Sequence, residues 1–154
     1  MKFLKCLFLL AAILFFSIRV SGQENLIRWI KECEKDKTVD MTVIDNKFPD
    51  TRKPDSYIVK IVLNNKPQLQ ELMFKAYEKD KAGAYSVIDK RIDGVMVPER
   101  CEFSKTEADK TVTQTTFDFY YNSKTGETTV IMIKTYDSTN PDLKKKRNRW
   151  FEGG

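Results

Sequence analysis

Two stretches of this sequence are nearly identical, and their repetition constrains the fold more than any other feature. EKDKTVDMTVID runs from Glu34 to Asp45, and EKDKAGAYSVID runs from Glu78 to Asp89, with seven of the twelve positions identical. Each copy starts at the end of a segment with helical hydrophobic spacing and continues into an alternating, strand-like segment. The repetition predicts two helix–strand–strand units packed into one sheet, since two units are too few for a solenoid. Chance resemblance between charged helix ends is the alternative, and the shared VID at the same offset argues against it.

Two amphipathic helices precede the two repeated stretches. The first is predicted over about 25–35, and the second follows Pro67, which suits the first turn of a helix, and stops before Gly83. Their apolar residues recur at helical spacing. These residues are Leu26, Ile27, Trp29, Ile30 and Cys33 in the first helix, and Leu69, Leu72, Met73, Ala76 and Tyr77 in the second.

The remaining sequence is rich in strand patterns of period two. Strands are predicted over about 38–47, 55–64, 84–92, 95–98, 111–123 and 127–137, and continuation of the fourth strand to 103 is an alternative. The order α-β-β-α-β-β-β-β, with short turns between consecutive strands, predicts an α+β fold with two helices packed on one face of a mostly antiparallel sheet of about six strands. Both faces of the last strand are apolar, which predicts a central strand covered on both sides or a strand buried against a partner.

The first 22 residues have the composition of a secretory signal peptide. Lys2 and Lys5 precede an apolar run of eleven residues from Cys6 to Phe16, and small residues stand before a cut at Gln23. The run is shorter than the roughly 20 residues of a spanning helix. We therefore expect a signal peptide over 1–22, a single α+β domain over 23–137, and an exported protein, periplasmic or secreted, with no transmembrane span after cleavage. Retention of the segment as an N-terminal anchor is the alternative.

The formal charge of +5 does not describe a basic folded surface. The predicted signal peptide holds Lys2, Lys5 and Arg19 and no acidic residue, so the rest of the chain carries +2. Five cations of that remainder lie in the last eleven residues, within a basic, flexible tail predicted over 138–154. The globular part therefore has no charge signature of nucleic-acid binding.

The sequence excludes several classes of catalysis. It has no histidine, no phosphate-binding glycine loop and no nucleophile elbow, so we expect a protein that is not an enzyme, without cofactor or metal. Paired carboxylates are the remaining acid–base candidates. Glu34, Asp36, Glu78 and Asp80 read as charged helix ends facing solvent. Asp45 and Asp89 are equivalent in the repeat and are expected close together on the sheet.

Two cysteines, Cys33 and Cys101, remain after the predicted signal peptide. An oxidising destination permits a disulfide between them. A disulfide needs Cα atoms within about 7 Å, which spacing along the chain does not decide. Cys33 also lies on the apolar face of the first helix, as a reduced core residue does, so both interpretations stay open.

Two segments are candidates for partner binding. The loop between the first two strands places Phe48 and Arg52 on a proline-stiffened connection, and stiff loops lose little entropy on docking. The tail joins cations to aromatic residues, which is the composition of an anchor for anionic lipid or glycan. The tail residues are Lys144, Lys145, Lys146, Arg147, Arg149, Trp150 and Phe151. An ordinary hairpin loop and a charged, solvated terminus are the alternatives.

The order of these elements is similar to that of a known group of proteins. The TVDMTVIDNK strand, the loop with two prolines, the stretch DSYIVKIVLNNKPQLQELMFKAYEKDKAGAYSVIDKR and the threonine- and tyrosine-rich last strands resemble small exported domains of unknown function from Gram-negative gut anaerobes, over about 24–136. The resemblance implies no activity and no functional residues. The order is also similar to that of helix-on-sheet binding modules such as the cystatin-like fold.

These observations lead to one expectation about function and two alternatives. We expect an exported, non-enzymatic binding module of the cell envelope, whose partner is an envelope protein or an anionic lipid or glycan. The first alternative is a small-ligand carrier or histidine-free enzyme with a pocket between helices and sheet, lined by Phe117, Phe119, Tyr77 and Tyr85. The second is a structural protein whose last two strands add to the sheet of another chain.

Overall fold

The computed structural model describes residues 22–47, 55–106, 108 and 111–138. It contains two helices, a short 3-10 turn and six strands, in the order that the sequence predicts. The elements are α2 (Glu24–Lys35), β1 (Asp40–Asn46), β2 (Asp55–Leu63), α3 (Pro67–Asp80), the turn η1 (Lys81–Gly83), β3 (Ser86–Ile92), β4 (Val95–Thr106), β5 (Thr111–Asn122) and β6 (Glu127–Ser138).

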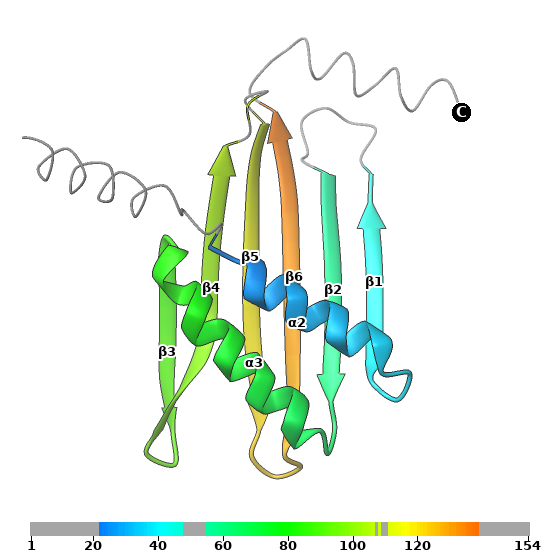
Figure 1. The fold of residues 1–154 in the computed structure, drawn as a ribbon, viewed down its shortest axis with the longest axis vertical. Coiled ribbons are helices and arrows are strands. Elements are labelled where there is room, and N and C mark those ends of the chain that lie inside the picture. The colour runs from blue at the N-terminus through cyan, green and yellow to red at the C-terminus, as the bar shows by residue number, and fades with distance from the viewer. Residues whose placement is uncertain (1–21, 48–54, 107, 109–110, 139–154) are drawn as a thin grey trace, which may run out of the picture.

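The strands form one open sheet in the order β1-β2-β6-β5-β4-β3, and every neighbouring pair is antiparallel. Both helices lie on the same face of this sheet (Figure 1). We call the opposite face, which neither α2 nor α3 covers, the open face. The α+β prediction is therefore confirmed, and the fold has two layers.

The two repeated units occupy equivalent places in the sheet. In each unit, a helix is followed by an edge strand, β1 or β3, and then by the next strand inward, β2 or β4. The β5–β6 hairpin separates the two units, and β6 pairs with β2 while β5 pairs with β4. The arrangement has the approximate two-fold symmetry that a duplicated helix–strand–strand unit predicts.

The core lies between the helices and the sheet, because the strands alternate. Residues of β2 and β5 at every second position are buried, whereas their neighbours face the open side. Each large side chain that is fully buried stabilises the fold by about 1.5–3 kcal/mol. The most buried large residues include Leu26, Ile61, Leu63, Met73, Tyr77, Phe117 and Phe119. Leu72, expected on the buried face of the second helix, is 47% exposed because α3 turns Met73, Ala76, Tyr77 and Asp80 inward.

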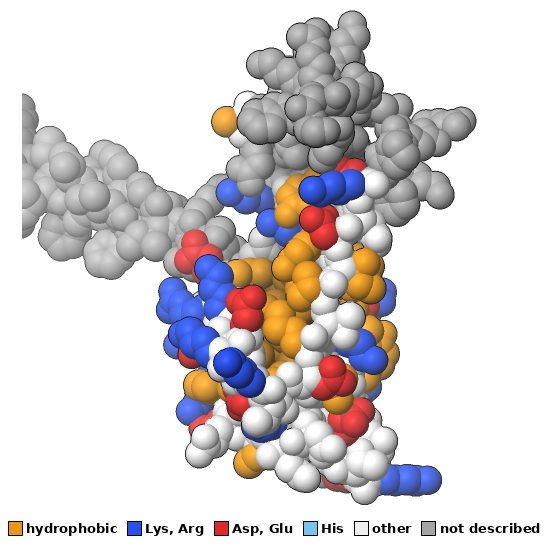
Figure 2. All heavy atoms as spheres, turned by 90° about the vertical axis from the view of Figure 1, so that its right-hand side faces the viewer, with side chains coloured by type: hydrophobic (Ala, Val, Ile, Leu, Met, Phe, Trp, Pro, Cys, Tyr) orange, Lys and Arg blue, Asp and Glu red, His pale blue; other side chains and the backbone are white. Residues whose placement is uncertain are grey.

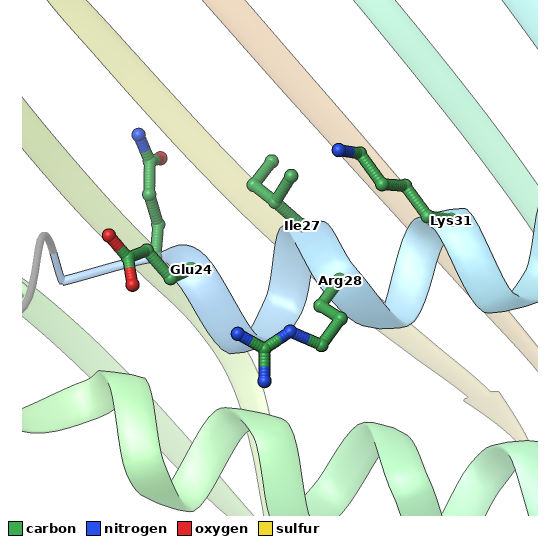
Figure 3. Close-up of a pocket in the computed structure, with 5 residues that line it drawn as sticks. Glu24, Ile27, Arg28 and Lys31 are labelled. Atoms are coloured by element: carbon green, nitrogen blue, oxygen red, sulfur yellow. The ribbon is translucent and has the colours of Figure 1, made fainter.

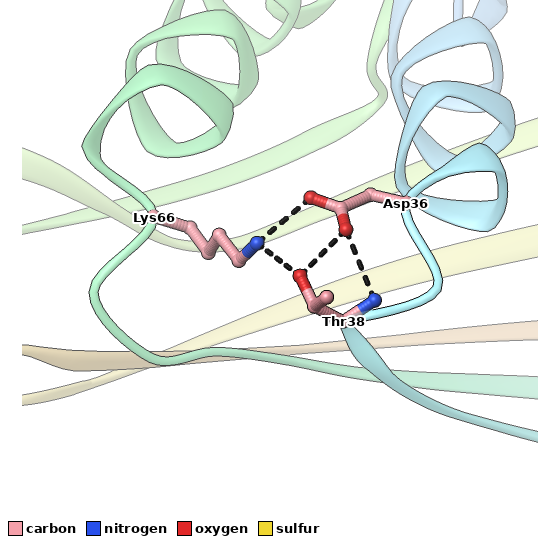
Figure 4. A network of polar contacts seen from close by, with 3 residues as sticks. All are labelled: Asp36, Thr38 and Lys66. Atoms are coloured by element: carbon pink, nitrogen blue, oxygen red, sulfur yellow. Dashed lines mark hydrogen bonds and ion pairs between the residues drawn. The ribbon is translucent and has the colours of Figure 1, made fainter.

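The ends of the two helices are linked through equivalent aspartates of the repeat. Asp36, which follows the last residue of α2, accepts a 2.8 Å hydrogen bond from the Nζ of Lys66, which precedes the first residue of α3 (Figure 4). Asp80, the last residue of α3, accepts a 2.7 Å hydrogen bond from the backbone N–H of Leu26 in α2. Asp80 is 1% exposed, so the expectation that it faces solvent is wrong. The carboxylate is buried because unpaired N–H groups of α2 need an acceptor.

The order of the strands overturns two further expectations and part of a third. β6 is central, as expected, but its Ile131 and Ile133 lie on the open face and are half-buried, so the described helices cover only one of its sides, and burial of the other side against a partner stays a prediction. The last two strands cannot add to another sheet, because both edges of β5 and of β6 are already paired. Asp45 lies in β1 and Asp89 in β3, at opposite edges, so they are far from each other in the sheet.

Candidate functional site

A groove runs along one side of α2, between this helix and the sheet. Its volume is about 300 Å³, and its wall and floor come from four elements. We call it the α2 groove. Its lining residues are Ile27, Ile30, Lys31 and Glu34 of α2, Met41 of β1, Tyr57 and Val59 of β2, and Met132, Lys134 and Tyr136 of β6.

The wall of the α2 groove follows from helical spacing. Ile27, Lys31 and Glu34 recur at three- and four-residue intervals, so they line one side of α2. The helix crosses the sheet in front of β5, β6, β2 and β1 (Figure 1). It therefore leaves parts of these strands uncovered, and the groove forms in the angle between the helix and the strands.

The floor of the α2 groove follows from cross-strand pairing between β2 and β6. Val59 lies opposite Met132, and Tyr57 lies opposite Lys134. Opposite residues of an antiparallel pair point to the same face, so both pairs face α2. Val59 and Met132 are 1% and 3% exposed, which makes the bottom of the groove apolar.

The rim of the α2 groove is polar and carries two cations. Lys31 and Glu34 stand on the helix side, and Lys134 stands on the sheet side, with its Nζ 5.1 Å from the centre of the Tyr136 ring. Within the described ranges, neither Lys31 nor Lys134 has a carboxylate at ion-pair distance. The arrangement suits an apolar group that carries a negative charge beside these lysines.

The space-filling view from the β1 edge shows the same arrangement. A band of hydrophobic side chains runs between the charged side chains of the helical layer and the edge of the sheet (Figure 2). The residues that line the α2 groove include Met41 of β1, the strand at this edge of the sheet. A ligand can therefore approach the groove from the side of β1.

A second depression, of about 310 Å³, lies at the N-terminal end of α2 and shares two lining residues with the α2 groove. Ile27 and Lys31 extend from one side of the helix, whereas Arg28 extends from the opposite side, toward α3 (Figure 3). Gln23 completes the lining together with Glu24, and the side-chain oxygen of Gln23 is buried without a hydrogen-bond partner among the described residues. The shared residues make the two hollows neighbours along α2.

Of the residues proposed from sequence, those that the structure describes do not line the α2 groove. Phe48, Arg52 and the tail residues Lys144, Lys145, Lys146, Arg147, Arg149, Trp150 and Phe151 lie outside the described residues. Phe117, Phe119 and Tyr77 are 0–1% exposed and fill the core, while Tyr85 is 61% exposed. A pocket between helix and sheet is present, but these four aromatic residues do not line it.

Cys33 and Cys101 are both buried, and both are free thiols in the structure, so the disulfide left open by the sequence is not formed. Burial raises the pKa of each thiol to about 12, because a thiolate loses its hydration in the core. Neighbouring carboxylates, chiefly Asp36 for Cys33 and Asp80 for Cys101, act in the same direction. Neither cysteine therefore has the properties of a nucleophile.

The described part of the chain contains neither a metal-site cluster nor a membrane-spanning helix. No group of three or more histidine, cysteine, aspartate or glutamate side chains is placed to hold a metal ion among these residues. None of the helices described here combines the length and the apolar character that crossing a membrane requires.

The signals for the α2 groove were present in the sequence but did not identify it. The spacing of Ile27 and Ile30 predicted an apolar helix face, and the alternation of Tyr57 and Val59 predicted an apolar strand face. Nothing in either pattern places β6 beside β2. Lys134 of β6 and Lys31 of α2 lie at the same rim only because β6 pairs with β2.

The fold and the groove define a class of protein, namely a small two-layer α+β domain with an apolar groove between its helical layer and its antiparallel sheet. The chain belongs to the family described as "Domain of unknown function (DUF5024)", whose model matches residues 23–133. The match runs from the residue before α2 into β6, so it includes both repeated units. Comparison with curated proteins and with solved structures gave no significant match.

Proposed function

We propose that this protein is an exported, non-catalytic binding module of the cell envelope, and that the α2 groove is its binding site. The observation that carries the proposal is the apolar floor of Val59 and Met132 beside two lysines, Lys31 and Lys134, that make no ion pair within the described residues. Concave sites with an apolar lining and a few converging polar groups are the usual form of a ligand site.

The ligand chemistry follows from the groove. An apolar group on the floor gains the hydrophobic free energy of leaving water, about 25 cal/mol for each Å² buried. A carboxylate, phosphate or sulfonate beside Lys31 and Lys134 gains charge-assisted hydrogen bonds. The ligand class is therefore an anionic amphiphile, either a lipid-like molecule or an apolar, acidic part of an envelope protein.

The non-catalytic part of the proposal is supported by the side chains available. The whole sequence lacks histidine, which is the commonest general acid or base at neutral pH. The ionisable groups that line the α2 groove are two lysines, two tyrosines and one glutamate. No hydrogen bond joins any of them to another in the described structure, so no nucleophile is paired with a base.

The envelope location is supported by the first 22 residues, which have the charged start, the apolar run and the small residues of a secretory signal. In this proposal the basic tail, Lys144 to Arg149, adds reversible attraction to anionic lipid or glycan, at about 1 kcal/mol for each cation near an anionic surface. The groove then supplies the specific contact and the tail supplies the attachment.

A small-ligand carrier is the second candidate. The volume of the α2 groove, about 300 Å³, is at the lower end of the range for small-molecule sites, roughly 300–1,000 Å³. In this case the groove holds a complete amphiphile instead of part of a macromolecule. The groove residues are the same in both candidates, and only the size of the ligand differs.

A dye titration tests the proposed site. Protein beginning at Gln23 is titrated with anilinonaphthalene sulfonate, which is apolar and anionic, and with phenylnaphthylamine, which is apolar and neutral. We expect saturable binding of the sulfonate, weakened about tenfold by Ile27→Trp, which fills the groove, and by Lys134→Met, which removes a cation. Phenylnaphthylamine should lose affinity with Ile27→Trp and keep it with Lys134→Met.

Leu72→Trp is the matched control, because Leu72 is an exposed apolar residue of the other helix and does not line the groove. Equal dye affinities for Ile27→Trp and Leu72→Trp would overturn the site. Envelope extracts are then passed over immobilised wild type, Ile27→Trp and Leu72→Trp to distinguish the binding module from the small-ligand carrier. A protein captured by wild type and Leu72→Trp but not by Ile27→Trp supports the binding module, whereas a lipid-like molecule captured in that pattern supports the carrier.

A further inference from the structure

The two edge strands of the sheet differ in how they are protected. Asp89 of β3 faces the helices and accepts a hydrogen bond from the hydroxyl of Tyr77. β3 also contains Lys90 and Arg91, and a bulge interrupts its pairing with β4 between Ile88 and Asp89. Inward-facing charges, lysines and bulges are the features that prevent edge strands from pairing with other chains.

β1 lacks these features between Met41 and Ile44, although Asp45 near its end faces the helix side, as Asp89 does in β3. Its sequence DMTVIDN contains no lysine, arginine, proline or glycine, and its pairing with β2 continues without a register shift. Val43 and Ile44, which point to opposite faces, are 48% and 46% exposed. An exposed apolar edge of this kind has unpaired backbone groups and apolar side chains ready for another strand.

We propose that β1 pairs with β1 of a second copy of this chain, antiparallel, about a two-fold axis at Val43. The two sheets then become one continuous sheet. The inference is independent of the ligand proposed for the α2 groove, since it rests on the edge of the sheet.

The charges along β1 favour this register. With Val43 on the axis, Val43 lies opposite Val43 of the second copy, Asp40 lies opposite Asn46, and Asp45 lies opposite Met41. No anion faces an anion. Shifting the pairing by one residue toward Thr42 would place Asp40 opposite Asp45 of the second copy, and like charges directly opposite are destabilising. β1 is therefore complementary to itself in the register centred on Val43.

The open face gives a second reason for a copy of the same chain. Ile44, Ile58 and Ile133 lie side by side in one cross-strand row. In the proposed pairing, Ile44 lies beside Thr42 of the second copy and next to the equivalent row of isoleucines. The two rows are offset by two residues, so Ile44 of each copy lies diagonal to Ile44 of the other, and part of its exposed side leaves the water in both copies.

Sedimentation velocity over a concentration series tests the pairing, with protein beginning at Gln23. We expect a monomer–dimer equilibrium that Val43→Lys shifts to monomer, with a loss of at least tenfold in association. Val87→Lys is the matched control, because Val87 is 40% exposed and faces the helix side of the opposite edge strand. Circular dichroism establishes that both variants are folded. A monomer at every concentration, or a dimer that Val43→Lys leaves intact, would overturn the proposal.

Cysteine cross-linking tests the register. Val43→Cys lies opposite itself in the proposed dimer, so mild oxidation should give a disulfide-linked dimer, whereas Val87→Cys should stay monomeric on a denaturing gel. Cys33 and Cys101 are buried and do not compete for oxidation in the folded protein. Equal cross-linking of the two variants would overturn the pairing at Val43. A protein that stays monomeric and binds an unrelated chain along β1 would overturn it as well.

Discussion

The carboxylate of Asp80 at the end of α3 accepts a 2.7 Å hydrogen bond from the backbone N–H of Leu26 in the first turn of α2. The side-chain amide of Asn25 donates a second 2.7 Å bond to the other oxygen of the same carboxylate. No side chain at Gln23 caps α2, so Asp80 supplies from another helix the acceptor that a capping residue usually supplies locally. The repeated EKDK sequence thus provides a connection between the two helices.

Replacing Asp80 tests this connection. Asp80→Ala leaves the N–H of Leu26 and the amide of Asn25 without their acceptor in a buried place, so we expect a loss of about 1–3 kcal/mol in the free energy of unfolding. Urea unfolding followed by circular dichroism measures it. Glu34→Ala, at an exposed position of α2, is the control and should change stability by less than about 0.5 kcal/mol. Equal midpoints for the two variants would contradict the role of Asp80.

The equivalent residue Asp36 predicts a dependence of stability on pH. The hydrogen bond from Lys66, followed by those from the side chain and backbone of Thr38, holds the pKa of Asp36 well below its usual range (Figure 4). A carboxyl whose pKa is lower in the folded state stabilises the protein above its unfolded pKa, about 3.9, and loses this effect as the pH falls below it.

Unfolding by urea at several pH values between 2 and 6 measures this effect. We expect Asp36→Asn to be less stable than wild type at pH 6 and to lose less stability than wild type between about pH 4 and pH 2. Asp93→Asn is the control, since it changes the same charge at an exposed turn. The assignment to Asp36 fails when Asp36→Asn and wild type lose stability in parallel below pH 4.

The tyrosines Tyr77 and Tyr121 provide a matched pair. The hydroxyl of Tyr77 donates a 2.5 Å hydrogen bond to Asp89, whereas the hydroxyl of Tyr121 is buried without a partner among the described residues. We expect Tyr77→Phe to lose about 1–3 kcal/mol, because it leaves the carboxylate of Asp89 without its donor. Tyr121→Phe should be neutral or stabilising, because it removes an unpaired polar group. Thermal unfolding distinguishes them, and the reverse order would contradict both assignments.

We predict that the thiols of Cys33 and Cys101 react slowly in the folded protein. A thiol with a pKa of about 12 is almost entirely protonated at pH 8, and only the thiolate reacts quickly. We expect iodoacetamide to leave both cysteines unmodified in the folded protein and to label both in urea. Mass spectrometry counts the labels. A protein that remains unlabelled in urea until a reductant is added would instead contain a Cys33–Cys101 disulfide.

The sequence by itself determined the local structure of this protein. The helical spacing of Leu26, Trp29 and Cys33 located α2, and the alternation of Val59, Ile61 and Leu63 identified the face of β2 that is buried. Asp-Gly is a sequence typical of a tight hairpin turn, and Asp93 and Gly94 between β3 and β4 have the positive φ angles, 49° and 83°, that such a turn requires. These features depend on neighbouring residues alone, so a periodic pattern is sufficient to reveal them.

Only the tertiary structure decided which elements meet. The β5–β6 hairpin pairs between the two repeated units, and this long-range pairing leaves β1 and β3 at the edges. It also places Lys134 at the rim of the α2 groove, and the packing of the helices turns Asp80 into a buried acceptor. Strand order and helix contacts are set by the free energy of packing between distant segments. Glu78 and Asp80, two charged residues at the same end of α3, therefore look alike in the sequence, although Glu78 is exposed and Asp80 is buried.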